Sequence, residues 1–129
     1  MKNKSLILIL EDDEITQLVY SGMFSKSADF DIFSCKNDKE FYAALEKHHF
    51  DLFLIDLGLN ESKDGLQIIK ELRQMDAYLT TPIIVVSAYT MQQDEQESIL
   101  AGANKFIRKP FEMNNLRSEI KKIMDSKPF

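Results

Sequence analysis

Three continuous apolar runs stand out along the chain, and each has the length of a β-strand. They are Leu6–Leu10, Leu52–Ile55 and Ile83–Val86. Runs without alternation are typical of strands that are covered on both faces of a sheet. Two further runs, Ile32–Cys35 and Lys105–Arg108, mix apolar with polar residues. We expect these two to form shorter, half-exposed strands at the edges of the sheet.

The segments between these runs carry apolar residues three or four positions apart, the spacing that places side chains on one face of a helix. In chain order the stripes are Ile15, Leu18 and Val19 with Gly22 or Met23; Phe41, Ala44 and Leu45; Leu66, Ile69 and Leu72; Ile99 and Leu100, after a largely polar segment from Met91; and Leu116, Ile120 and Ile123. Asn37 and Asp38 can cap the second helix. Gly102 follows the fourth helix, where a left-handed residue is favoured.

Strand and helix therefore alternate five times, which predicts an α/β fold with a parallel sheet and helices on both faces. Right-handed crossovers leave few possible topologies. If the three most apolar strands are central and the two mixed strands lie at the edges, the order 2-1-3-4-5 fits. This is the doubly wound, flavodoxin-like arrangement of five strands.

Composition narrows the class of protein. The chain has 129 residues, the size of one domain, and we assign residues 1–125 to it, with 126–129 as a short tail and no output domain. A net charge of −5 without a basic block argues against direct nucleic-acid binding. No apolar run reaches the roughly 18 residues that membrane insertion needs. The single cysteine, Cys35, fits a reducing, cytoplasmic setting.

Polar residues follow four of the predicted strands, at the edge where open α/β sheets place their sites. They are Glu11–Glu14 after the first strand, Asp56 after the third, Ser87 after the fourth and Lys109 after the fifth. Two carboxylates 4 Å apart repel by about 4 kcal/mol at an effective dielectric of 20. A hard divalent cation relieves that repulsion, and Mg²⁺ prefers oxygen ligands. We therefore expect a Mg²⁺ site at this edge.

Asp56 is the candidate nucleophile of this group. A carboxylate beside a metal ion, a lysine and a serine can attack a phosphoryl group and form an aspartyl phosphate. Each acid by itself fits a helix cap, and Asp13 or Glu14 can cap the first helix. The combination at matching strand ends favours a phosphoacceptor site.

Five stretches of the chain resemble the receiver domain of bacterial two-component response regulators. They are LILILEDDE, DLFLIDLGL, DGLQIIKELR, PIIVVSA and GANKFIRKPF. Together they span nearly the whole chain in the order and at the spacing of that family. The resemblance implies a regulatory domain, not an enzyme, that takes a phosphoryl group from a sensor histidine kinase or a histidine phosphotransfer protein. It also implies a possible downstream effector protein as a second partner.

The resemblance assigns four residues to the metal site. Asp12 is the direct carboxylate ligand, Glu11 acts through water, Asp56 is the phosphoacceptor and a ligand, and the backbone carbonyl of Gly58 is the third protein ligand. One departure concerns the loop that follows. Residues 58–65 contain no proline and are one residue longer than the commonest form of the family, which affects the shape of the loop rather than the chemistry.

The resemblance also assigns the residues of a switch. Ser87 is the switch hydroxyl, Phe106 the switch aromatic, and Lys109 the lysine that binds the phosphoryl group, with a cis Lys109–Pro110 peptide bond. Phosphorylation is expected to draw Ser87 toward the phosphoryl group and to let Phe106 turn inward. The surface of the fourth helix, fifth strand and fifth helix then changes.

Three other functions are open to a chain of this pattern. A flavin-binding electron carrier of the same topology needs a phosphate cradle after the first strand, where this chain has Glu11–Glu14. An aspartate-based phosphatase places its nucleophile at the first strand. A phosphorylation-independent, receiver-like interaction module is the main alternative, although such a module is expected to have lost the acceptor, the acid pair or the lysine.

Overall fold

The computed structural model describes residues 4–57, 65–88 and 92–125. Strands and helices alternate along them as the sequence predicts. The elements are β1 (Ser5–Leu10), α1 (Glu14–Phe24), β2 (Phe30–Cys35), α2 (Asp38–Lys47), β3 (Leu52–Asp56), α3 (Gly65–Leu72), the 3-10 helix η1 (Asp76–Tyr78), β4 (Ile83–Ser87), α4 (Gln92–Ala101), β5 (Lys105–Arg108) and α5 (Met113–Asp125).

The five strands form one parallel sheet in the order β2-β1-β3-β4-β5. The predicted order is confirmed, with β2 and β5 at the edges. β3 and β4 each extend one residue beyond the predicted run, to Asp56 and Ser87. These two polar residues are therefore the last residues of buried strands, which fixes their backbones in the sheet.

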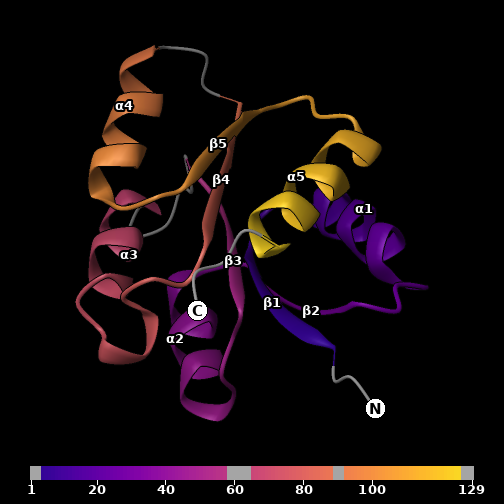
Figure 1. Ribbon diagram of the computed structural model, residues 1–129, viewed down its shortest axis with the longest axis horizontal. Helices are drawn as coiled ribbons and strands as arrows, with labels where there is room; N and C mark the ends of the chain where they lie inside the picture. Colours follow the sequence, from indigo (N-terminus) through magenta and orange to yellow (C-terminus); the bar gives the residue numbers. More distant parts are fainter. Residues whose placement is uncertain (1–3, 58–64, 89–91, 126–129) are drawn as a thin grey trace.

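The helices cover both faces of the sheet, with α1 and α5 on one face and α2, α3 and α4 on the other (Figure 1). Side chains of the strands alternate between the two core layers. Ile7, Ile9, Leu52 and Leu54 pack toward α1 and α5, whereas Leu8, Leu10, Phe53 and Ile55 pack toward α2 and α3. Each fully buried side chain of this size contributes about 1.5–3 kcal/mol, so the two layers hold the strand ends rigidly.

The apolar stripe that the sequence predicts for α1 does not face the sheet, except at Met23. Ile15, Leu18 and Val19 share one face, but that face points to solvent, with 72%, 71% and 37% of their surface exposed. The buried residues of the helix are Tyr20, Met23 and Phe24. Both faces carry apolar residues, and the larger rings of Tyr20 and Phe24 occupy the space against the sheet.

The carboxyl end of α4 is held by Arg73, which follows α3. Its guanidinium donates hydrogen bonds to the carbonyl oxygen of Gly102 at 3.0 and 2.8 Å, and to the carbonyl oxygens of Tyr78 and Thr81 at 2.9 and 2.7 Å. Gly102 has φ +129°, in the left-handed region that the sequence predicts for this position. One side chain thus ties together α3, the segment before β4 and the end of α4.

Candidate functional site

Three of the predicted site residues meet at the carboxyl edge of the sheet. Nζ of Lys109, which follows β5, lies 2.8 Å from Oε1 of Glu11 and 3.1 Å from Oδ2 of Asp56. Glu11 follows β1 and Asp56 ends β3, so the contact spans the middle of the sheet. The convergence that the sequence predicts for these side chains is therefore present in the folded chain.

The acids Glu11, Asp12 and Asp56 form a group that can hold a metal ion. One carboxylate oxygen from each lies within 4.8 Å of the others. Glu11 and Asp56 are buried, whereas Asp12 is exposed, so the group opens to solvent on one side. An all-oxygen donor set with an accessible side suits Mg²⁺, which retains several of its waters.

The electrostatics of this group are unbalanced. Burial, and then the hydrogen bond and charge of Glu11, raise the pKa of the Asp56 carboxyl, although Lys109 acts in the opposite direction. Burial tends to lower the pKa of Lys109, but its contacts with Glu11 and Asp56 raise it above the usual value. The single ammonium group of Lys109 therefore does not neutralise the negative charge of the acids, and a bound divalent cation would neutralise the remainder.

The backbone around Glu11 is fixed by local hydrogen bonds. The N–H of Glu11 donates to the carbonyl oxygen of Cys35 at 2.9 Å, and Nε2 of Gln17 donates to the carbonyl oxygen of Glu11 at 2.6 Å. Asp13 accepts from the N–H of Thr16 at 2.9 Å and caps α1, as the sequence allows. Asp13 is therefore held in a structural role beside the three acids.

Gly65 brings the start of α3 against the end of β3. A Cβ at this position would lie 2.8 Å from Cδ2 of Leu57 and 3.1 Å from the carbonyl oxygen of Asp56. These distances leave no room for a side chain without moving the backbone of Asp56. The sequence does not predict the roles of Gly65 and Gln17 at the site, because both residues act through contacts with backbone atoms.

The two predicted switch residues lie on neighbouring strands, Ser87 at the end of β4 and Phe106 inside β5. Ser87 is fully buried at the end of β4, and its carbonyl oxygen accepts from the N–H of Lys109 at 2.8 Å. Phe106 in β5 is half-buried and packs against the core layer under α2 and α3. The Lys109–Pro110 peptide bond is cis, as expected. Gly58, the predicted carbonyl ligand, and the loop after it lie outside the described residues.

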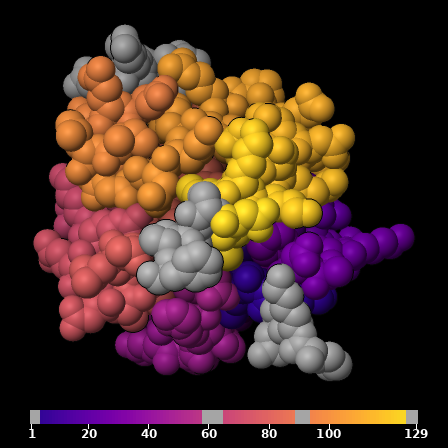
Figure 2. Space-filling view, viewed as in Figure 1, coloured from indigo at the N-terminus to yellow at the C-terminus, as the bar shows by residue number. Residues whose placement is uncertain are grey.

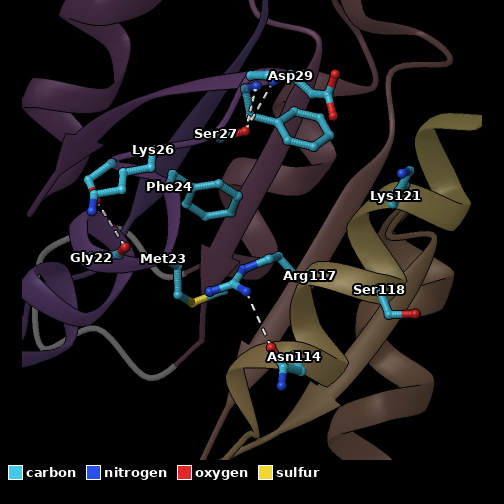
Figure 3. A pocket seen from close by; sticks show the side chains of 13 residues that line it. Gly22, Met23, Phe24, Lys26, Ser27, Asp29, Asn114, Arg117, Ser118 and Lys121 are labelled. Atoms are coloured by element: carbon cyan, nitrogen blue, oxygen red, sulfur yellow. Dashed lines mark hydrogen bonds between the residues drawn. The ribbon is translucent and has the colours of Figure 1, made fainter.

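A groove of about 870 Å³ lies elsewhere, between the carboxyl end of α1 and the outer side of α5 (Figure 3). Met23, Phe24 and Phe30 line it, together with Arg117 and Lys121 from the α5 side. None of the acids near Asp56 lines this groove. The candidate chemical site is therefore defined by its charged groups and not by the size of a hollow.

Comparison with known proteins decides the family. Residues 7–121 match the response regulator receiver domain. This chain belongs to that family. Receiver domains are regulatory modules of two-component signalling and accept phosphoryl groups from histidine kinases. Within the described residues, no helix has the length and apolar character needed to cross a membrane.

Curated relatives of this receiver domain include proteins of different lengths. The transcriptional regulatory protein KdpE of Staphylococcus aureus is 35% identical over 121 residues, which cover 93% of this chain and 50% of KdpE. The polar-differentiation response regulator DivK of Brucella anthropi is 28% identical over 115 residues, covering 89% of this chain and 92% of DivK. The chain spans about half the length of several of the curated relatives it matches.

Solved receiver structures share the fold. A response regulator from Thermotoga maritima has a TM-score of 0.83 and 27% identity, covering 96% of this chain and 100% of that one. The receiver domain of the sensor histidine kinase PA1611 from Pseudomonas aeruginosa has a TM-score of 0.84 and 24% identity, covering 96% and 100%. That protein was crystallised with a magnesium ion in its active site cleft.

Proposed function

We propose that the chain is a Mg²⁺-dependent phosphoacceptor switch in which Asp56 takes a phosphoryl group. The observation that carries the proposal is the position of Asp56. Its carboxylate ends a buried strand, is 9% exposed, lies 3.1 Å from the Lys109 ammonium group and belongs to a group of three acids. A nucleophile, a countercharge and metal ligands are thus adjacent.

Glu11, Asp12 and Asp56 are the side chains that would hold Mg²⁺, with Gly58 as a proposed carbonyl ligand. When bound, the ion supplies positive charge for the oxygens of the transferred group. Lys109 contributes in the same way, because its ammonium group can donate to a phosphoryl oxygen as well as to carboxylates. Ser87 supplies a hydroxyl donor on the neighbouring strand.

The reaction itself is a transfer between two nucleophiles. An oxygen of the Asp56 carboxylate forms a bond to phosphorus while the bond from phosphorus to the donor nitrogen of a phosphohistidine breaks, and that nitrogen keeps the electron pair and takes up a proton. Lys109 and Ser87 orient the phosphoryl oxygens during the transfer. The protein therefore contributes mainly positioning and electrostatic stabilisation.

The outer face of α1 suits a docking partner. Ile15, Leu18 and Val19 form an exposed apolar stripe one turn beyond the acid group, and nothing lies within 4 Å of a Cβ built on Gly22 in the same stripe. Exposed apolar patches next to a reactive site mark protein interaction surfaces. We propose that the histidine kinase or histidine phosphotransfer protein packs a helix here while its histidine reaches Asp56.

The output surface would be the one formed by α4, β5 and α5, which is continuous in Figure 2. Ser98 is the buried side chain among the described residues of α4, while Ile99 and Leu100 are exposed. A helix with so little buried surface moves at low cost, and Arg73 holds its carboxyl end. We propose that movement of Ser87 and Phe106 shifts the population of α4 and β5 positions that an effector protein recognises.

Binding of beryllofluoride, a mimic of the phosphoryl group, tests the proposed acceptor. With Mg²⁺ present, fluorine NMR of the parent should show bound beryllofluoride signals, and Asp56→Asn should show none. Asp29→Asn, an exposed acid outside the group, should bind as the parent does. Bound signals of equal intensity in Asp56→Asn would contradict the assignment of Asp56.

A further inference from the structure

A stacked pair of aromatic rings joins α1 to the segment that carries Lys109. The ring of Tyr20 lies parallel to that of Phe111, with centroids 5.7 Å apart and an interplanar angle of 6°. Tyr20 is 1% exposed, and Phe111 packs against the same core layer from its edge. The stack therefore attaches the segment after β5 to a rigid, buried position.

That segment carries Lys109 and is held on both sides of it. Residues 109–112 belong to neither β5 nor α5. On one side, the N–H of Lys109 is held by the carbonyl oxygen of Ser87. On the other side, Phe111 follows two residues later and is held by Tyr20. A lysine loses roughly 1.5–2 kcal/mol of side-chain entropy when it is fixed, so a rigid base favours its contacts with Glu11 and Asp56.

The hydroxyl of Tyr20 is a separate feature from its ring. Burial, and then the negative charges of Glu11 and Asp56, raise the pKa of Tyr20, so the hydroxyl stays protonated. The contact between Tyr20 and Phe111 is made by the ring and not by the hydroxyl. A phenylalanine would retain this ring stack.

We propose that Tyr20 is a positioning residue of the phosphoacceptor site, whose ring holds Phe111 and thereby aims Lys109 at Asp56. This inference rests on the proposed function in one respect, which is that Lys109 binds the phosphoryl group. The position of Lys109 can be measured without any phosphorylation. In this role Tyr20 acts through Phe111 and not directly on the acids or the transferred group.

Rates of phosphorylation by acetyl phosphate test the role in solution, because a small donor needs no docking surface. At saturating Mg²⁺, Tyr20→Leu should slow phosphorylation about tenfold, whereas Tyr20→Phe should stay within about twofold of the parent. If Tyr20→Leu does not fold, Phe111→Leu replaces it as the test, because it removes the other ring of the stack from a less buried position. Phe111→Leu should slow phosphorylation to the same extent. The matched control is Phe24→Leu, since Phe24 lies in the same layer but pairs with Phe30.

Two readouts separate positioning from general loosening of the core. In a Lys109→Ala background, Tyr20→Leu should change the residual rate less than about twofold, because coupled residues are not additive. Mg²⁺ affinity by calorimetry should stay within about twofold of the parent, since Tyr20 is no metal ligand. An equal loss with Phe24→Leu, a loss that persists without Lys109, or a matching loss in Tyr20→Phe would overturn the proposal.

Crystal structures of the variants give the answer that does not depend on the proposed function. In Tyr20→Leu the Nζ of Lys109 should leave hydrogen-bond distance of Asp56, and in Tyr20→Phe it should remain. If Lys109 keeps both contacts in Tyr20→Leu, the positioning role is wrong. If Lys109 moves but the parent accepts no phosphoryl group, the proposed function fails and the positioning role stands.

Discussion

Replacing Asp56 with asparagine should stabilise the protein in the absence of divalent metal. Two carboxylates 4.8 Å apart, the limit of the acid group, repel by about 3.5 kcal/mol at an effective dielectric of 20. At the same dielectric the ion pair of Asp56 with Lys109 at 3.1 Å contributes about 5.4 kcal/mol, which is more than the repulsion from one acid but less than the roughly 7 kcal/mol from Glu11 and Asp12 together. Because the pKa of Asp56 is nevertheless raised, repulsion and burial outweigh that ion pair, and we expect a net gain of about 2 kcal/mol in Asp56→Asn.

The gain should depend on pH with a defined sign. Burial and Glu11 raise the pKa of Asp56 from 3.8 to about 8, so between these values the folded chain holds a proton that the unfolded chain releases. The free energy of unfolding of the metal-free parent should therefore fall as pH rises through this window. Asp56→Asn lacks this group, and its advantage should grow from pH 5 to pH 8.

Urea denaturation followed by circular dichroism, with EDTA present, measures both effects. Asp29→Asn is the control and should change the free energy of unfolding by less than about 0.5 kcal/mol. Added Mg²⁺ should narrow the difference between the parent and Asp56→Asn, because the ion binds the folded parent. A metal-free parent as stable as Asp56→Asn, with no difference in pH dependence, would refute the electrostatic reasoning.

Three further changes probe docking, backbone and capping. Leu18→Lys on the exposed stripe of α1 should slow phosphotransfer from a cognate histidine donor at least about tenfold, yet leave acetyl phosphate labelling unchanged; equal slowing of both would argue against docking. Gly102→Ala should lower the free energy of unfolding by about 1–3 kcal/mol, because its Cβ would lie 2.6 Å from Cγ of Arg73. The control Gly22→Ala, which has open space around its Cβ, should not lower it. Asn37→Ala removes the cap that accepts from the N–H of Glu40 and should cost about 1 kcal/mol in urea melts; no change would exclude that cap.

The order of strands could be predicted because it depends on a simple contrast. Leu6–Leu10, Leu52–Ile55 and Ile83–Val86 are uniformly apolar, and a strand with both faces covered has to lie inside the sheet. The mixed runs then fall at the edges. The convergence of Glu11, Asp56 and Lys109 follows from the same topology, because parallel strands bring their carboxyl ends to one edge.

The orientation of α1 could not be predicted from periodicity. Ile15 and Leu18 lie on one face and Met23 and Phe24 on another, and both faces are apolar enough to be buried. Packing against the sheet selects the face with the larger rings, a choice that depends on the shape of the neighbouring layer. The apolar stripe that remains outside is consequently available for a partner.

The residues that hold helices and connecting segments in place cannot be found from sequence motifs, for a different reason. Arg73 binds backbone carbonyl oxygens, and any residue type can supply those acceptors. Gly65 is needed because the space beside it is occupied by Leu57 and the backbone of Asp56. The stack of Tyr20 on Phe111 joins residues far apart in the chain. Such contacts depend on distances in the folded chain, and no local spacing in the sequence encodes them.

The central claim is that Asp56 accepts a phosphoryl group with the help of Mg²⁺ and Lys109. The most direct measurement is mass spectrometry of the protein after incubation with acetyl phosphate, with and without Mg²⁺, followed by mapping of the labelled peptide. One phosphoryl group per chain, on the peptide that contains Asp56 and only with Mg²⁺, is the expected result. Label on another peptide, label of equal extent in Asp56→Asn, or no label in the parent would contradict the account.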